Sequence, residues 1–130
     1  MSRFSELIDV VRRLRGPDGC PWDREQTPQS LRGCLLEESY EVLDALDRDD
    51  ADDLRDELGD LLLQIVMQAE MAAAAKRFTL DDVIAGIMSK MVRRHPHVFA
   101  DAVVADTAEV LRNWSRIKTE ERARKGGGAD

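Results

Sequence analysis

The chain has 130 residues, of which 26 are acidic and 19 basic, so its formal net charge at pH 7 is −7, and 43% of the residues are hydrophobic. This length suits one domain, and the acidic balance disfavours a nucleic-acid-binding protein because such proteins present basic surfaces to phosphates. No apolar run approaches the ~20 residues of a membrane span, and two cysteines without a preceding apolar signal segment favour the reducing cytoplasm. We therefore expect a cytoplasmic protein with no membrane or nucleic-acid partner, with a single domain at residues 1–124 and a disordered glycine-rich tail at 125–130.

Apolar residues at helical spacing predict an all-α protein, and no segment shows the period-2 alternation of a strand. About five helices are expected, at residues 4–14, 28–47, 50–76, 79–94 and from 106 onward. Thr27 followed by Pro28 is typical of a helix start, whereas Pro96 disfavours helical geometry at the residue before it, and residues 15–27 should form a loop. The turn between the second and third helices is short, so these two helices should form a central antiparallel hairpin.

Two pairs of acidic residues fall at matching heights of this hairpin. Glu38 and Glu41 on its first helix are three residues apart, as are Glu57 and Asp60 on its second, so each pair shares a helix face. When two antiparallel helices fold about residue 49, Glu41 lies level with Glu57 and Glu38 with Asp60. Glu38 also falls beside the apolar stripe of its helix, where an unpaired charge is costly.

A hard divalent cation would balance these four carboxylates. Mg²⁺ and Mn²⁺ prefer oxygen ligands, and no histidine or cysteine pattern accompanies the acidic pairs. The Glu-x-x-His pair of di-iron bundles is absent, since the only histidines are His95 and His97. The alternative is an acidic helical face with local pairing, for which Arg48 and Arg55 are the cations within the acidic stretch.

A basic group follows further along the chain. Lys90 and Arg94 are four residues apart and share a helix face that suits an anion, although the helix dipole also favours basic residues near a helix C-terminus. Trp114 and Lys118 are likewise four apart, which suits a base-stacking aromatic beside a phosphate contact. A core Trp114 with a surface Lys118 explains that spacing equally well.

Four segments in order resemble the MazG family of nucleoside triphosphate pyrophosphohydrolases, all-α enzymes grouped with dimeric dUTPases. They are GCPWDREQT at 19–27, LLEESYEVLDAL at 35–46, DELGDLLLQIV at 56–66 and RRHPHVF at 93–99, followed by residues 114–118. The resemblance implies hydrolysis of a nucleoside triphosphate at the α-phosphorus to a nucleoside monophosphate and pyrophosphate. It implies Mg²⁺ held by Glu38, Glu41, Glu57 and Asp60, catalytic roles for Glu37, Glu38 and Glu41, and nucleotide contacts from Lys90, Arg94, Trp114 and Lys118.

The apolar residues of the hairpin form more than one stripe. The stripe expected to face inward comprises Leu31, Leu35, Val42 and Leu46. Leu36 and Leu43 on the first helix, with Leu62 and Val66 on the second, form further stripes that a single hairpin cannot bury. We therefore expect a homodimer or larger homo-oligomer, and the resemblance implies that two hairpins then pack into a four-helix bundle.

The expected function is nucleoside triphosphate pyrophosphohydrolysis in nucleotide-pool housekeeping. The sequence shows one copy of a pattern that better-known family members carry in tandem. Two alternatives are a helical module of the same fold that binds nucleotides without hydrolysing them, and a plain acidic oligomerisation domain. Both are disfavoured because neither has a chemical need for all four implied metal ligands.

Overall fold

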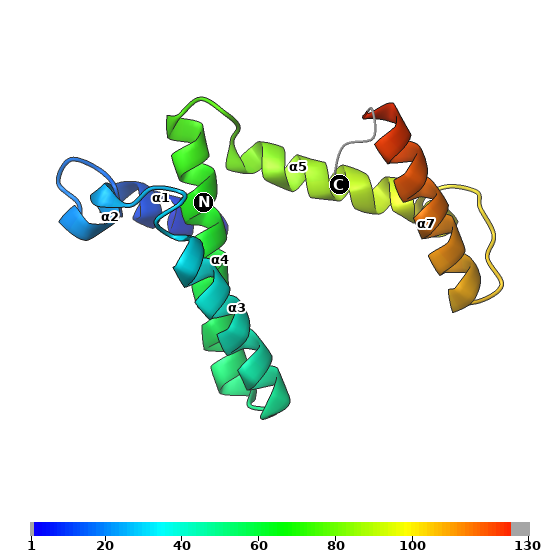
Figure 1. Cartoon of the computed structure of the whole chain (residues 1–130), viewed down its shortest axis with the longest axis horizontal. Coiled ribbons are helices and arrows are strands. Elements are labelled where there is room, and N and C mark those ends of the chain that lie inside the picture. The colour runs from blue at the N-terminus through cyan, green and yellow to red at the C-terminus, as the bar shows by residue number, and fades with distance from the viewer. Residues whose placement is uncertain (1, 126–130) are drawn as a thin grey trace. The chain divides into compact units, whose positions relative to one another are not determined.

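The computed structural model describes residues 2–125, and this part of the chain is helical, with no strand. Its seven helices are α1 (Arg3–Leu14), α2 (Pro21–Glu25), α3 (Arg32–Asp47), α4 (Ala51–Ala74), α5 (Leu80–Arg94), α6 (Pro96–Phe99) and α7 (Thr107–Arg124) (Figure 1). The predicted all-α class and the five long helices are confirmed. Apart from Lys125, the predicted disordered tail lies outside the described residues. None of the described helices combines the length and the apolar character that crossing a bilayer requires.

The two short helices were not predicted, and each begins at a proline. Pro21 opens α2 within the segment expected to be a loop, and Pro96 opens α6 directly after α5. Proline suits the first helical position because that position needs no N–H donor and its φ is already helical. The prediction was wrong here because it treated Pro96 only as the end of the preceding helix.

The first helix of the hairpin begins at Arg32 and not at Pro28 as predicted. Thr27 does accept a hydrogen bond from the backbone N–H of Ser30, at 3.1 Å, as a capping threonine would. The Ser30 hydroxyl, however, bonds the carbonyl oxygen of Thr27 at 3.0 Å and the side chain of Gln26 at 2.8 Å. These local side-chain bonds hold residues 28–31 in a turn that competes with helix.

The chain divides into two compact units, one ending at Leu80 and the other starting at Asp81, which are described separately. In the first unit α3 packs along α4 as the predicted antiparallel hairpin, and α1 packs against α4 (Figure 1). Asp49 adopts a left-handed φ of 54° in the tight turn, a conformation that aspartate tolerates better than most residues. Asp50 then caps α4 by accepting the backbone N–H of Asp53 at 3.1 Å. The helix therefore begins within one residue of its predicted start at residue 50.

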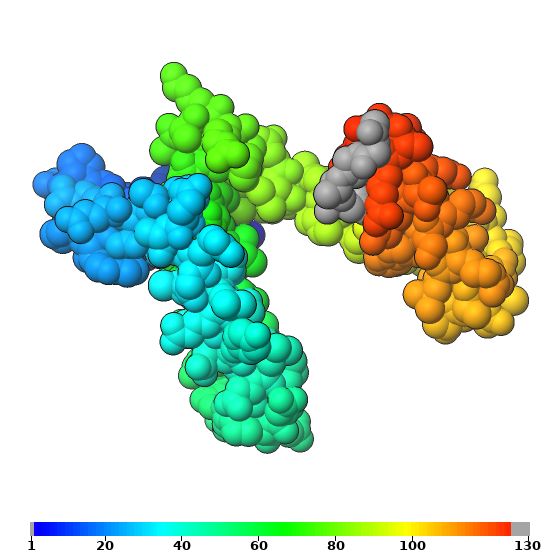
Figure 2. Space-filling model, viewed as in Figure 1, coloured from blue at the N-terminus to red at the C-terminus, as the bar shows by residue number. Residues whose placement is uncertain are grey.

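The core of the first unit is apolar, and it corrects two predicted positions. Its buried side chains are Val11, Leu31, Ala45, Val66, Met67, Ala69, Met71, Ala72 and Leu80. Val66 is fully buried, so it does not belong to an unburied stripe as predicted, whereas Leu46, expected to face inward, is 54% exposed. Leu36 and Leu43 remain exposed, and Figure 2 shows the side chains of α3 with no other element of the first unit over them in this view. The hairpin thus buries its inner seam and leaves an outer apolar face.

The second unit contains α5, α6 and α7. Asp106 caps α7 by accepting the backbone N–H of Glu109 at 2.9 Å, and the Glu109 carboxylate accepts the backbone N–H of Ala105 at 2.9 Å. This reciprocal arrangement resembles a capping box, and α7 begins directly after residue 106, where a helix was predicted to start. Ile117 is the buried apolar residue of α7, and one turn beyond it Glu121 is buried as well.

Candidate functional site

The hairpin brings three of the predicted acidic residues together. Glu38 of α3 and Glu57 and Asp60 of α4 each offer a carboxylate oxygen, and these oxygens all lie within 4.8 Å of one another. Glu38 and Glu57 are half-buried and Asp60 is exposed. Glu38 and Asp60 were predicted to lie level on the two helices, and their carboxylates do lie close together. We call these three residues the acidic cluster.

Glu41 and Glu37 lie outside the acidic cluster. Glu41 is exposed on α3, but its negative charge still raises the pKa of both Glu38 and Glu57. Glu37 is exposed too, and its charge raises the pKa of Glu38. The five predicted carboxylates thus share one electrostatic environment, in which three are in mutual contact range and two flank them.

Burial and mutual repulsion perturb the acidic cluster. Burial raises the pKa of Glu38 most, followed by the negative charge of Asp60, while a hydrogen bond with Glu57 partly offsets this rise. Burial also raises the pKa of Glu57 most, followed by the charges of Glu38 and Asp60. Such carboxyl groups hold protons more tightly than ordinary glutamates because each ionised neighbour opposes further ionisation.

The residues fit a metal ion. Glu38 Oε2 is buried and has no hydrogen-bond partner among the described residues, which is an unfavourable state for a carboxylate oxygen. A cation would supply the missing partner and offset the repulsion within the acidic cluster. All the ligand atoms are carboxylate oxygens, which hard divalent cations prefer. The cluster can therefore hold a metal ion, and a hard divalent cation is the best chemical match.

Arg48 and Arg55 do not neutralise the acidic cluster. Arg48 bonds Asp53 at 2.6 Å and Asp44 at 3.1 Å, so it serves the turn between α3 and α4. Arg55 lies 3.4 Å from Asp56 and bonds along the exposed surface of α4. The local pairing that was the alternative to a metal site therefore involves aspartates outside the acidic cluster.

Sequence reasoning missed Gln64, which lies one turn beyond Asp60 on α4 and so shares its helix face. The Gln64 Oε1 atom is buried and has no hydrogen-bond partner within the described chain. The available signal was that Gln64 interrupts the apolar run of residues 61–63. A second unpartnered oxygen therefore lies on the face of α4 that carries Asp60.

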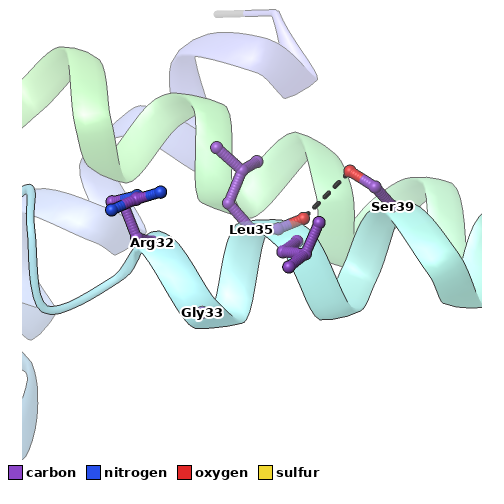
Figure 3. A pocket seen from close by; sticks show the side chains of 5 residues that line it. Arg32, Gly33, Leu35 and Ser39 are labelled. Atoms are coloured by element: carbon purple, nitrogen blue, oxygen red, sulfur yellow. Dashed lines mark hydrogen bonds between the residues drawn. The ribbon is translucent and has the colours of Figure 1, made fainter.

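A groove of about 490 Å³ runs along the first half of α3 (Figure 3). Its lining residues are Arg32, Gly33, Leu35, Leu36 and Ser39. The Ser39 hydroxyl donates to the carbonyl oxygen of Leu35 at 2.9 Å, so it is used within the helix. Because the exposed Leu36 forms part of this groove, we group the groove with the outer apolar face of the hairpin and not with the acidic cluster.

The predicted nucleotide-contacting residues all lie in the second unit. Lys90, Trp114 and Lys118 are half-buried, and Arg94 is 7% exposed. The guanidinium carbon of Arg94 lies 5.7 Å from the centroid of the Trp114 ring, in cation–π range. The structure thus brings Arg94 and Trp114 together, although they belong to different helices.

Sequence reasoning also missed Glu121, which bonds both Arg93 and Arg94. Hydrogen bonds from these two arginines lower the pKa of the Glu121 carboxyl to about 2. In the sequence this residue is one of two consecutive glutamates in an exposed-looking charged stretch, so no local signal distinguished it.

Comparisons with known proteins point to one family. Residues 26–99 match the MazG nucleotide pyrophosphohydrolase domain, and this segment contains the whole acidic cluster. A crystal structure of a mazG-related protein from Thermotoga maritima superposes with a TM-score of 0.73 and 26% sequence identity, over 88% of this chain and 98% of that one. The chain belongs to the MazG family.

Two longer proteins are also similar in sequence to this chain. The nucleoside triphosphate pyrophosphohydrolase of Escherichia coli strain K12 is 53% identical over 126 residues, which are 96% of this chain and 48% of that protein. The nucleoside triphosphate pyrophosphohydrolase/pyrophosphatase MazG of Thermotoga maritima is 43% identical over 122 residues, 94% of this chain and 46% of that protein. The chain therefore spans about half the length of these relatives.

Proposed function

We propose that this protein hydrolyses nucleoside triphosphates at the α-phosphorus, releasing a nucleoside monophosphate and pyrophosphate, and that it serves nucleotide-pool housekeeping. The observation that carries the proposal is the acidic cluster, with its unpartnered Glu38 oxygen, inside the segment that matches the family domain. The names of the relatives in Escherichia coli and Thermotoga maritima support the same activity.

Mg²⁺ is the proposed cofactor, with Mn²⁺ as a substitute, and Glu38, Glu41, Glu57 and Asp60 are its proposed ligands. A bound Mg²⁺ would screen the triphosphate and polarise the α-phosphoryl group. A bound cation would lower the raised pKa of Glu38 and of Glu57, because it favours the ionised carboxylates. The negative charge of the exposed Glu41 raises the pKa of both Glu38 and Glu57, and Glu41 would complete the ligand set.

Glu37, Glu38 and Glu41 are the proposed catalytic residues. A carboxylate of this group orients the attacking water and accepts its proton as the water oxygen bonds to the α-phosphorus. The bond between the α-phosphorus and the bridging oxygen then breaks, and pyrophosphate leaves with the bonding electrons. Glu37 suits the role at the water because it is exposed beside the cluster and outside the group of closest ligands.

The second unit supplies the proposed nucleotide contacts. Lys90, Arg94 and Lys118 would bind phosphate oxygens and stabilise charge on the leaving pyrophosphate. Trp114 would stack on the base, a contact that every nucleobase can make. This set of residues does not select one base or sugar, so we propose the substrate only as a nucleoside triphosphate.

We further propose that two copies associate through the outer apolar face of the hairpin and form a four-helix bundle. Leu36, Tyr40 and Leu43 of α3 are 53–63% exposed, and Leu62 of α4 is 39% exposed. Together they form an apolar surface of the kind that marks protein–protein contacts.

The test is a panel of ribo- and deoxyribonucleoside triphosphates incubated with the purified protein and Mg²⁺ in ¹⁸O-labelled water, with every product identified. We expect pyrophosphate and a labelled monophosphate, because attack at the α-phosphorus transfers the water oxygen to the monophosphate. Release of nucleoside diphosphate and inorganic phosphate would contradict the proposed reaction. Metal-independent binding without turnover would support the non-catalytic module instead. Glu38→Gln should abolish pyrophosphate release because it replaces a proposed metal ligand, whereas Glu25→Gln, a change at an exposed glutamate of α2, should leave the release unchanged.

A further inference from the structure

The second unit contains a buried ion-pair cluster that the proposed catalytic roles do not use. The side chain of Glu121 on α7 is 5% exposed and that of Arg94 on α5 is 8% exposed. Arg94 Nε donates to Glu121 Oε1 at 3.0 Å, and Arg93 Nη2 donates to Glu121 Oε2 at 2.8 Å. Both oxygens of one carboxylate are thus engaged by consecutive arginines.

Arg94 contacts both Glu121 and Trp114. Glu121 binds its Nε edge, and the Trp114 ring lies 5.7 Å from its guanidinium carbon. The same ring is supported by His95, which packs edge-on at 5.1 Å and whose Nδ1 lies 2.6 Å from the carbonyl oxygen of Met91. These contacts restrict the Arg94 side chain to one orientation against the indole.

The ion-pair cluster holds an ionised carboxylate between two arginines. Hydrogen bonds from Arg93 and Arg94 lower the pKa of Glu121 to about 2, so the carboxylate is ionised at neutral pH and pairs with both arginines. A nucleotide, which joins phosphates to an aromatic base, matches a cation beside an indole ring.

We propose that Glu121 is a positioning residue for nucleotide binding, which holds Arg94 in the orientation in which Arg94 and Trp114 meet the substrate. This inference rests on the proposed function, which assigns Arg94 and Trp114 to the nucleotide. Glu121 acts through Arg94 and does not itself contact the phosphates, because both of its oxygens are engaged and its charge repels them. The alternative is a tether that only joins α5 to α7, and such a tether predicts lower stability with unchanged nucleotide affinity.

The test compares Glu121→Gln with Glu120→Gln, the adjacent glutamate, whose side chain is 61% exposed. We expect Glu121→Gln to raise KM by about 10- to 100-fold, the range that follows when a binding group loses its alignment, and to lower kcat by a smaller factor because Arg94 also stabilises the leaving pyrophosphate. Glu120→Gln should keep the KM of the parent protein. The dissociation constant of a triphosphate with a non-hydrolysable α,β-methylene bridge, measured by calorimetry, should rise by the same factor.

A double-mutant cycle with Arg94→Lys tests whether Glu121 acts through Arg94. Lysine keeps the charge but lacks the Nε edge that Glu121 binds, so the effect of Glu121→Gln on KM should largely disappear in the Arg94→Lys background. Additive effects, or a folded Glu121→Gln variant with unchanged KM and dissociation constant, would overturn the inference. If Glu121→Gln fails to fold, Glu121→Asp, which keeps the charge but shortens the side chain, provides the same comparison, and its KM should exceed that of the parent protein. If the parent protein hydrolyses no triphosphate, the proposed function is wrong. If Glu121→Gln is active and its KM equals that of the parent protein, only the proposed role of Glu121 is wrong.

Discussion

Glu38→Gln should have opposite effects on stability in the absence and in the presence of Mg²⁺. Glutamine has nearly the shape of glutamate, but it removes one of the three negative charges whose oxygens lie within 4.8 Å of one another. Its amide can also donate hydrogen bonds to Glu57 or Asp60. We therefore expect the metal-free variant to be more stable than the parent protein, and its response to Mg²⁺ to be weaker.

The higher stability expected for Glu38→Gln without metal follows from the unpartnered Glu38 oxygen of the parent protein. A buried acceptor without a partner costs about 1–3 kcal/mol, and the lower end applies because Glu38 is only half-buried. Unfolding 130 residues has an entropy of about 270 cal/mol/K, so 1 kcal/mol shifts Tm by about 4 °C. The metal-free Tm of Glu38→Gln should therefore rise by about 4 °C.

The response to Mg²⁺ follows from the lost ligand. At a Mg²⁺ concentration about 100 times its Kd, the parent protein gains about 2.7 kcal/mol, or about 10 °C in Tm. Loss of even an outer partner of a metal ligand lowers affinity by about 10- to 100-fold, so loss of a ligand should reach the upper value. The same Mg²⁺ then stabilises the variant by only about 0.4 kcal/mol, or about 1.5 °C.

The assay is thermal unfolding at pH 7, first with a chelator and then over a titration of MgCl₂. Glu25→Gln is the control and should match the parent protein in both conditions, because Glu25 is exposed on α2. Circular dichroism checks that the helical content is retained. A Glu38→Gln variant that is less stable without metal, and that gains as much from Mg²⁺ as the parent protein, would refute the reasoning.

Three further predictions concern the core, the acid stability and the outer face. Leu31→Ala should lower stability by about 2–5 kcal/mol, since Leu31 is 1% exposed, while Val10→Ala at a 53% exposed position should change the unfolding free energy by less than about 0.5 kcal/mol in denaturant titrations. The lowered pKa of Glu121, about 2 against 4.5, means that its ionised form stabilises the fold above pH 4.5 and that this contribution is lost as the pH falls towards 2. Tm measured against pH should therefore fall less steeply between pH 4.5 and 2 in Glu121→Gln, and an unchanged slope would contradict this. Leu43→Glu places a charge on the outer apolar face, so light scattering should show a smaller assembly than for the parent protein, and an unchanged mass would argue against association through this face.

Much of the fold could be predicted because its signals are local. Helical periodicity indicated the long helices, and the predicted start at residue 50 lies within one residue of Ala51, where α4 begins. The errors arose where local signals compete. Pro21 and Pro96 can end one helix or begin another, and the Ser30 hydroxyl bonds backbone and side-chain oxygens that the expected first turn of α3 would have displaced.

Part of the candidate site was also predictable from sequence. Residues three apart on a helix share a face, and a short turn sets the register of the two helices, so Glu38 was expected beside Asp60. Exposed and buried positions at the ends of the hairpin were less predictable. Val66 and Leu46 exchanged their expected environments because burial depends on which face α1 and α4 cover, and the periodicity of one helix does not contain that information.

The sequence by itself determined the all-α class, the hairpin and the acidic residues that meet across it, because helix geometry and a short turn depend on neighbouring residues. Only the tertiary structure decided that Glu38 Oε2 and Gln64 Oε1 are buried without a hydrogen-bond partner among the described residues. It also decided that Arg94 donates a hydrogen bond to Glu121, 27 residues further along the chain. The physical reason is that desolvation and side-chain pairing between helices depend on how the helices rotate and pack. Those contacts form only once distant segments of the chain lie side by side.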